Sequence, residues 1–200
     1  MRRGTTIFEL ALAVSVVTVT AWYLVPFFAH AGGKTRKASC TGNLQLLAQA
    51  VLMYSHDHDD TLPGGAGMGP NGAWGPAWWA LIQPYVKNHS VLVCPAQVNP
   101  PGAYDTNWPI SYGCNPNFMG WQKGARIDQV VSPPGTIMLG EKSCGDWAVF
   151  PSDSDPAGPD GPFRVDCRHD GGANYAFLDG RVHWMKKGDD STPVNLWINR

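Results

Sequence analysis

A run of nineteen residues near the N-terminus, residues 10–28, contains no charged side chain. As an α-helix this run would be about 28 Å long, which matches the hydrocarbon core of a bilayer. Two arginines precede it and three basic residues follow it by position 37, so loop charge does not fix its orientation. The run predicts a membrane-spanning helix over about residues 7–30.

The rest of the chain has the composition of a loop-rich globular domain. Glycine (23) and proline (17) make up a fifth of the 200 residues, which favours turns and short strands over a helical bundle. With 44% hydrophobic and 16% charged residues the chain is not wholly disordered. The net charge of −1 predicts no basic surface for nucleic acid. Five cysteines behind an export-type N-terminus indicate an oxidising compartment.

Glu9 is the acidic residue that stands at the start of the apolar run. A carboxylate there costs about 2–3 kcal/mol deep in a bilayer and less near the interface, so it is a candidate functional residue. Two simpler interpretations of the segment are a plain signal anchor and a secretory signal cleaved near Ala29-His30-Ala31. A plain anchor gives Glu9 no role.

The N-terminus carries a specific arrangement of a basic stretch, a glycine, a glutamate and a proline. A short basic stretch ends at Gly4, Glu9 follows five residues later, and Pro26 stands twenty-two residues after the glycine. This arrangement resembles the leader of type IV prepilins and type II secretion pseudopilins. The resemblance implies that a membrane peptidase cleaves after Gly4 and methylates Thr5, although family members usually have phenylalanine there. It also implies that Glu9 pairs with the N-terminal amine of a neighbouring subunit, and Pro26 is expected to kink the helix.

The C-terminal quarter contains a hairpin signal. Asp179-Gly180 separates two strand-like runs, which predicts a hairpin over residues 173–186 with a two-residue type I′ turn. His169 precedes Asp179 by nine intervening residues, a spacing that resembles a C-terminal signature of prepilin-like proteins. Weaker pieces of the same resemblance are Cys40 with Asn43-Leu44, Tyr54 to Pro63, Trp79 to Tyr85, Cys94-Pro95, Ser111-Tyr112 and Glu141.

His169 and Asp179 are not predicted to form a catalytic dyad. In a fully extended chain they would lie about 33 Å apart. No serine or cysteine beside them has a sequence position that indicates a nucleophile. A structural histidine at a turn and an aspartate required by turn geometry account for both residues. We therefore predict no enzymatic activity.

Between the two ends, the pattern predicts one more stretch of helix and several short strands. Apolar residues recur at helical spacing over residues 39–54, as a stripe formed by Leu44, Leu47, Ala48 and Val51. We expect this stripe to pack on a sheet. Residues 78–86 predict a short helix, residues 90–95 and 136–141 predict strands, and residues 110–115 predict a strand or a turn.

The expected fold class is α+β: a long N-terminal helix, half of it transmembrane, packed on a small antiparallel β-sheet body with long loops, as in pilins. The expected organisation is a leader over residues 1–4, the helix over residues 5–56 and the body over residues 57–200. Such a chain is a small globular domain carried on a membrane anchor.

Two disulfides are expected from the five cysteines. Cys40 lies on the extramembrane part of the helix and Cys94 ends a strand that should pack near it, so we predict that they pair. Cys144 and Cys167 flank an aspartate-rich loop and could pair to close it, which would leave Cys114 free.

The aspartate-rich loop is the candidate metal site. Asp153, Asp155 and Asp160 offer the carboxylate oxygens that Ca²⁺ prefers, and secretion pseudopilins, which the chain resembles, often bind calcium in a C-terminal loop. The prolines between them exclude an EF-hand. Calcium binding and an exposed, turn-rich insertion both remain open, and calcium is the one cofactor that the sequence suggests.

The predicted function is a structural subunit of a type IV pilus-like or type II secretion pseudopilus filament. Its expected partners are further copies of itself, other pilin-like subunits, the prepilin peptidase and the membrane, with no nucleic acid. It is expected in the cytoplasmic (inner) membrane with its body outside the cytoplasm, and in a periplasmic or cell-surface filament after assembly. The alternative is a single-pass, membrane-anchored extracytoplasmic binding domain, for instance one that binds glycans, which does not polymerise.

Overall fold

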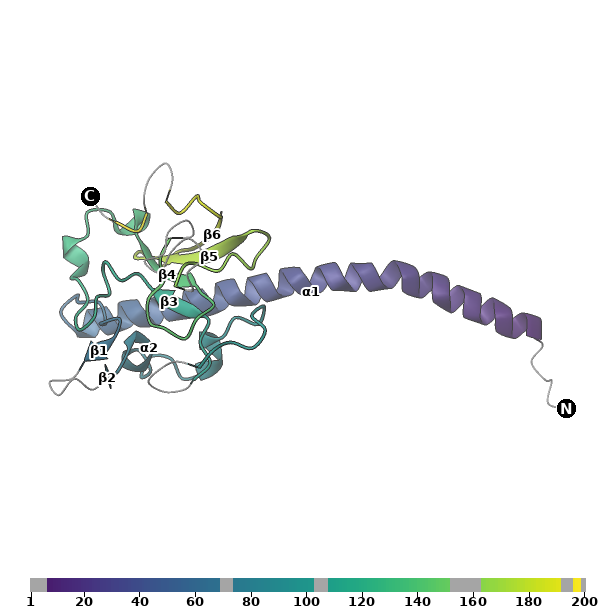
Figure 1. The fold of residues 1–200 in the computed structure, drawn as a ribbon, viewed down its shortest axis with the longest axis horizontal. Helices are drawn as coiled ribbons and strands as arrows, with labels where there is room; N and C mark the ends of the chain where they lie inside the picture. Colours follow the sequence, from purple (N-terminus) through teal and green to yellow (C-terminus); the bar gives the residue numbers. More distant parts are fainter. Residues whose placement is uncertain (1–6, 69–73, 103–107, 152–162, 192–195, 199–200) are drawn as a thin grey trace. The chain divides into compact units, whose positions relative to one another are not determined.

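The computed structural model describes the chain except for residues 1–6, 69–73, 103–107, 152–162, 192–195 and 199–200 (Figure 1). Over residues 25–32 it describes the helical backbone alone. The chain divides into two compact units, Met1–Arg36 and Lys37–Arg200, which are described separately below. One helix, α1 (Ile7–Asp57), supplies the described part of the first unit and the first element of the second.

The first unit is an apolar helix. Its segment Ile7–Leu24 is long and apolar enough to cross a membrane, and none of it is buried within the protein. The hydroxyls of Ser15, Thr18 and Thr20 donate to backbone carbonyls three or four residues earlier, at 2.6–3.0 Å. These local bonds satisfy the polar groups that hydrocarbon would otherwise leave unpaired. The helical backbone continues through Pro26.

The second unit is built around the C-terminal part of α1. Leu44, Leu47, Ala48 and Val51 are fully buried, so the predicted apolar stripe is confirmed. The helix ends at Asp57, close to the predicted end at residue 56. Two aspartates with positive φ, Asp59 and Asp60, then turn the chain away from the helix axis.

An antiparallel sheet of four strands packs with this helix. Its order is β3 (Tyr112–Cys114), β4 (Ile137–Glu141), β5 (Gly172–Phe177) and β6 (Val182–Lys186). All residues of β3, β4 and β5 are buried. The strand predicted at residues 136–141 is therefore an inner strand, β4, and the α+β class with a small antiparallel sheet is confirmed.

Both faces of the sheet are covered, which explains why its inner strands are mostly apolar. Along β5, Ala173, Tyr175 and Phe177 belong to one core cluster with Trp197. Ala176 belongs to the other cluster, which contains the α1 stripe. The alternation follows the period of two that a strand imposes on its side chains.

Short elements complete the second unit. They are β1 (Gly67–Met68), β2 (Trp74–Gly75), α2 (Trp78–Leu81) and the 3₁₀ turns η1 (His89–Leu92), η2 (Ile127–Gln129) and η3 (Pro133–Gly135). In Figure 1 the sheet and α2 lie on opposite sides of this part of α1. The predicted short helix is α2, and the tryptophans Trp78, Trp79, Trp147 and Trp197 are buried in the two core clusters.

The strand predicted at residues 90–95 is wrong, because the segment forms the 3₁₀ turn η1 instead. The side chain of Asn88 accepts a hydrogen bond from the backbone N–H of Ser90 at 3.0 Å, and this local bond starts a turn. Val91 and Leu92 are still buried. The apolar run thus fills the core without joining a sheet.

The hairpin predicted over residues 173–186 is confirmed as β5 and β6, but its turn differs from the prediction. The N–H of Gly180 donates to the carbonyl of Phe177 and the N–H of Phe177 donates to the carbonyl of Arg181, both at 2.9 Å. Gly180 has a φ of +84°, whereas Asp179 is not in the positive-φ region. This is a three-residue turn with a glycine bulge, not a two-residue type I′ turn. The loop is longer because Leu178 is buried and its N–H donates to the carbonyl of Thr136.

A two-residue turn of the type I′ class occurs at another aspartate-glycine pair, Asp170-Gly171. Both residues have positive φ, 55° and 75°. The flanking residues His169 and Gly172 exchange both of their backbone hydrogen bonds, at 3.0 and 3.1 Å. This turn leads into β5, so the signature from His169 to Asp179-Gly180 consists of one turn, one strand and a second turn.

Gly180→Ala tests the bulge. An alanine side chain at φ +84° is strained and would also approach Leu52, so we expect the free energy of unfolding to fall by about 1–2 kcal/mol. Gly42→Ala is the matched control: this helical glycine has open space around it, and the change should stabilise the chain by about 0.5–1 kcal/mol. Urea unfolding of the full chain in detergent, followed by tryptophan fluorescence, measures both. Equal effects of the two changes would contradict the assigned turn.

Candidate functional site

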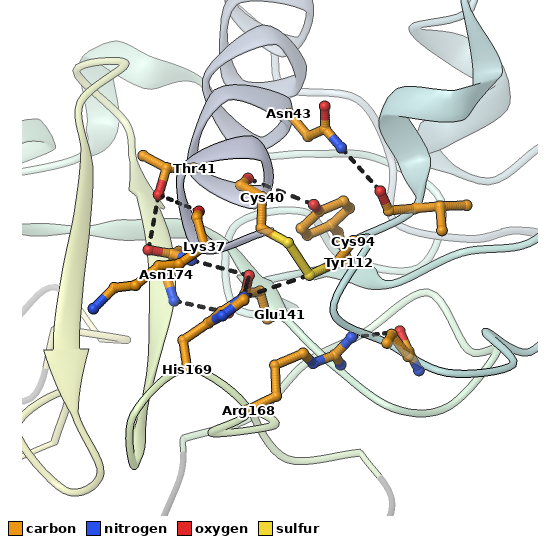
Figure 2. Close-up of a disulfide and its surroundings, with 12 residues drawn as sticks. Lys37, Cys40, Thr41, Asn43, Cys94, Tyr112, Glu141, Arg168, His169 and Asn174 are labelled. Carbon is orange, nitrogen blue, oxygen red and sulfur yellow. Dashed lines mark hydrogen bonds and ion pairs between the residues drawn. A yellow bond between two sulfur atoms is a disulfide. The ribbon is translucent and has the colours of Figure 1, made fainter. Parts of the chain in front are cut away.

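Several of the predicted site residues meet where α1 packs on the sheet. Lys37, Cys40, Thr41 and Asn43 lie within two turns of α1, inside the second unit (Figure 2). Residues three and four positions apart share one face of a helix, which brings these side chains to the same surface. Cys40 is fully buried and the other three lie at the edge of the contact.

The disulfide predicted between Cys40 and Cys94 is present. It joins α1 to the segment that follows η1, across a sequence separation of 54 residues. Two hydrogen bonds flank it: Asn43 Nδ2 donates to the carbonyl of Val93 at 2.9 Å, and the Tyr112 hydroxyl donates to the carbonyl of Cys40 at 3.5 Å. One stretch of α1 is therefore tied to both the η1 segment and β3.

Beside the disulfide lies a fully buried carboxylate, Glu141, the last residue of β4. Its Oε2 accepts a hydrogen bond from the backbone N–H of Asn174 at 2.9 Å, and its Oε1 accepts one from Asn174 Nδ2 at 3.1 Å. Asn174 Oδ1 in turn lies 3.1 Å from the Thr41 hydroxyl on α1. The network runs from β4 through β5 to the helix, and it compensates the cost of burying the carboxylate.

His169 completes the cluster from the turn that precedes β5. Its Nε2 lies 3.0 Å from Glu141 Oε1 and 3.4 Å from Cys94 Sγ, and the residue is buried (Figure 2). Trp184 Nε1 donates to its backbone carbonyl at 2.8 Å. The two-residue turn at Asp170-Gly171 and the bond from Trp184 both hold the imidazole against the carboxylate and the sulfur.

This geometry differs from that of a nucleophile, base and carboxylate relay. In such a relay the histidine uses one ring nitrogen for the nucleophile and the other for the carboxylate. Here the same atom, Nε2, faces both Cys94 Sγ and Glu141 Oε1, and Cys94 is already bonded to Cys40. The arrangement can fix elements together and offers sulfur, nitrogen and oxygen atoms to a metal ion.

Asp179 lies at the far end of β5 from His169 and does not belong to the cluster. Its Oδ1 accepts a hydrogen bond from the backbone N–H of Arg181 at 3.0 Å, and its Oδ2 pairs with the guanidinium of the same residue. Gly180 supplies the positive φ of the bulge. Both residues act in the geometry of the turn, as predicted for them.

The remaining predicted site residues are distributed elsewhere. Gly4, Thr5 and the calcium candidates Asp153, Asp155 and Asp160 lie outside the described residues. Glu9 is exposed in the first turn of α1.

The second disulfide, suggested between Cys144 and Cys167, is not formed, and both residues are free thiols together with Cys114. Cys167 packs against the core cluster around Trp197, whereas Cys144 lies in the irregular segment after β4. The two cysteines lie in different environments, and the predicted pairing is wrong.

Asn174 and Thr41 were missed as site residues. The sequence signal for Asn174 is a polar residue at the centre of an apolar strand run, which in a buried strand requires hydrogen-bond partners. Thr41 has no comparable signal, because threonine is unremarkable on a half-exposed helix face.

No family model, curated protein or solved structure matches the chain.

Lys142, the residue directly after β4, is fully buried. Among the residues that the structure describes, its Nζ has no hydrogen-bond partner, and it lies 5.8 Å from the centroid of the Trp79 ring. Burial lowers the pKa of Lys142 to about 8, against a partial opposing effect of Cys144, Asp146 and Cys114. A charged lysine in this place destabilises the fold.

Lys142→Met should stabilise the protein at pH 7. The pKa of Lys142 is about 8 in the folded chain and near 10.5 in the unfolded chain. Between pH 8 and 9 the unfolded chain therefore binds more protons than the folded chain, so the free energy of unfolding of the unmodified protein should rise with pH. Above pH 9 the raised pKa of the buried Cys114 thiol opposes this rise. Replacement by methionine should remove the rise and add about 3 kcal/mol at pH 7.

Lys123→Met, at an exposed lysine, is the control and should leave the pH dependence unchanged. Urea titrations at pH 7, 8 and 9 make the comparison. A rise between pH 8 and 9 that persists in Lys142→Met would contradict the assignment.

Proposed function

We propose that this chain is a structural subunit of a type IV pilus-like or type II secretion pseudopilus filament, anchored in the membrane by its N-terminal helix before assembly. In this proposal the leader is removed between Gly4 and Thr5, and the body lies outside the cytoplasm. The helices of many copies then pack together in the filament while the bodies cover them.

The observation that carries the proposal is the composition of α1. Its segment Ile7–Leu24 is apolar and exposed along its whole length, whereas Leu44, Leu47 and Val51 of the same helix are buried in the core of the second unit. An exposed apolar surface of this size requires lipid or other protein as its environment. The helix of a filament subunit lies in lipid before assembly and among the helices of other subunits afterwards, so it meets both environments.

Glu9 provides a physical reason why the helices of neighbouring subunits would pack in one fixed axial register. It lies in the first turn of α1, where the helix dipole favours a negative charge. Cleavage after Gly4 would create a new cation, the amine of Thr5, four residues before it. In an assembled filament the amine of an adjacent subunit would neutralise Glu9 and fix the axial register, whereas within one chain the same two groups would pair locally.

The alternative function, an anchored binding domain that does not polymerise, has its own support. A pocket of about 590 Å³ opens near the end of α1. It is lined by Tyr54, Asp57, His58, Asp59, Thr61, Leu62, Gly64, Pro76, Leu81, Gln122 and Lys123. Its lining combines polar and apolar groups, which suits a small ligand that has both. An anchored binding domain has no need of Glu9, whereas a filament subunit does. Substitution of Glu9 therefore distinguishes the two functions.

Glu9→Val should leave the body folded and the chain in the membrane, yet abolish filament growth. A stranded amine among packed helices costs about 3–5 kcal/mol per subunit, which repeats along the filament. The measurement is electron microscopy of sheared surface material from cells that express the variant alone, with mass spectrometry of the subunit. The mature mass should lack residues 1–4.

Thr18→Val is the matched control, since it also replaces a polar side chain of the apolar helix by valine. The Thr18 hydroxyl is satisfied within its own helix, so this variant should assemble normally. If Glu9→Val subunits build normal filaments, the role of Glu9 between subunits is wrong. If the unchanged chain builds none and keeps its leader, the anchored binding domain replaces the filament subunit.

A further inference from the structure

Four potential metal ligands converge in the core of the second unit. Cys40 Sγ, Cys94 Sγ, a carboxylate oxygen of Glu141 and a ring nitrogen of His169 all lie within 4.8 Å of one another, and all four residues are buried. They come from α1, the segment after η1, the end of β4 and the turn before β5. Figure 2 shows the imidazole of His169 beside the Glu141 carboxylate and joined by a dashed line to the sulfur of Cys94.

The donor set and its spacing suit Zn²⁺. Zinc binds thiolate sulfur at about 2.3 Å and imidazole nitrogen or carboxylate oxygen at about 2.0–2.2 Å, in tetrahedral geometry. Neighbouring ligand atoms of such a site are roughly 3.3–3.8 Å apart by the same geometry. His169 Nε2 is already 3.4 Å from Cys94 Sγ and 3.0 Å from Glu141 Oε1. The pair that must separate is the bonded pair of sulfurs.

We propose that the chain binds one Zn²⁺ through Cys40, Cys94, Glu141 and His169 when the disulfide between the two cysteines is reduced. A thiol or phosphine reductant supplies two electrons, which with two protons convert the disulfide into two thiols. Zinc then displaces both thiol protons and is held by two thiolates, one carboxylate and one neutral imidazole. The disulfide and the metal ion exclude each other, because both use the same sulfur atoms.

The surroundings of Glu141 provide the outer ligand shell that such sites require. The backbone N–H and the side-chain amide of Asn174 both donate to the carboxylate, at 2.9 and 3.1 Å. They fix its orientation before any metal arrives. His169 is fixed in the same way through its backbone, which accepts from Trp184 Nε1 and pairs with Gly172. Two of the four ligands are therefore preorganised, and the cysteines are placed by the helix and by η1.

Zinc would hold the same elements together as the disulfide does. With the disulfide formed, α1 is covalently joined to the segment after η1; with zinc bound, it would also be joined to β4 and to the turn before β5. The contact between helix and sheet would then be retained in both oxidation states. A reduced chain would be stabilised by the free energy of metal binding.

The test uses the full chain in detergent with Cys114→Ala, Cys144→Ser and Cys167→Ser, so that Cys40 and Cys94 are the remaining thiols. The oxidised and phosphine-reduced forms are each titrated with Co²⁺ and then with Zn²⁺. The reduced form should bind one Co²⁺ per chain with the absorption of a tetrahedral thiolate site, and Zn²⁺ should displace it. The oxidised form should bind neither ion at this site.

Two variants in the same background probe the ligands. Cys94→Ala should abolish the tetrahedral thiolate absorption, and Asn174→Ala should weaken zinc binding about 10–100-fold by releasing the carboxylate. Circular dichroism follows the fold, and if the reduced chain unfolds, one equivalent of zinc should refold it. A reduced chain that neither binds nor is refolded by Zn²⁺ would overturn the proposal, as would undiminished binding in Cys94→Ala.

Discussion

The buried carboxylate of Glu141 organises the contact between helix and sheet. A charge in the core is tolerated only when its oxygens are fully hydrogen-bonded, and here Asn174 and His169 supply those bonds. Asn174 also reaches Thr41 on α1, and His169 reaches Cys94 of the disulfide. One side chain thus connects β5, the turn before it and, through Asn174, the helix. Loss of either partner would leave the buried carboxylate with fewer hydrogen bonds.

The proposed function gives this contact a mechanical meaning. In a filament whose helices form the centre, each body would be carried by the α1 segment that packs beneath its own sheet. Cys40–Cys94 would fasten that segment covalently, and the chain-entropy model assigns such a 54-residue crosslink about 4 kcal/mol. Both cysteines of the bond are fully buried. Body and helix would then move as one during extraction from a membrane.

Features with a local sequence signal could be predicted, and features that depend on distant partners could not. The α1 stripe, β4 and the β5–β6 hairpin follow from periodicity and turn residues. The pairing of Cys40 with Cys94 followed from placing one on the helix and the other near it. The network around Glu141 joins residues 28 and 33 positions apart, and no local pattern encodes those contacts. The wrong turn type predicted between β5 and β6 has the same origin. Asp179-Gly180 allows a two-residue or a three-residue turn, and burial of Leu178 favours the longer one.

Disulfide mapping tests the central claim, that α1 is locked to the body through Cys40 and Cys94, most directly. The full chain is purified and denatured, its free thiols are alkylated without reduction, and its peptides are identified by mass spectrometry. The account predicts one crosslink, between the peptides of Cys40 and Cys94, with Cys114, Cys144 and Cys167 alkylated. Alkylated Cys40, or a crosslink from Cys40 to any other cysteine, would contradict it.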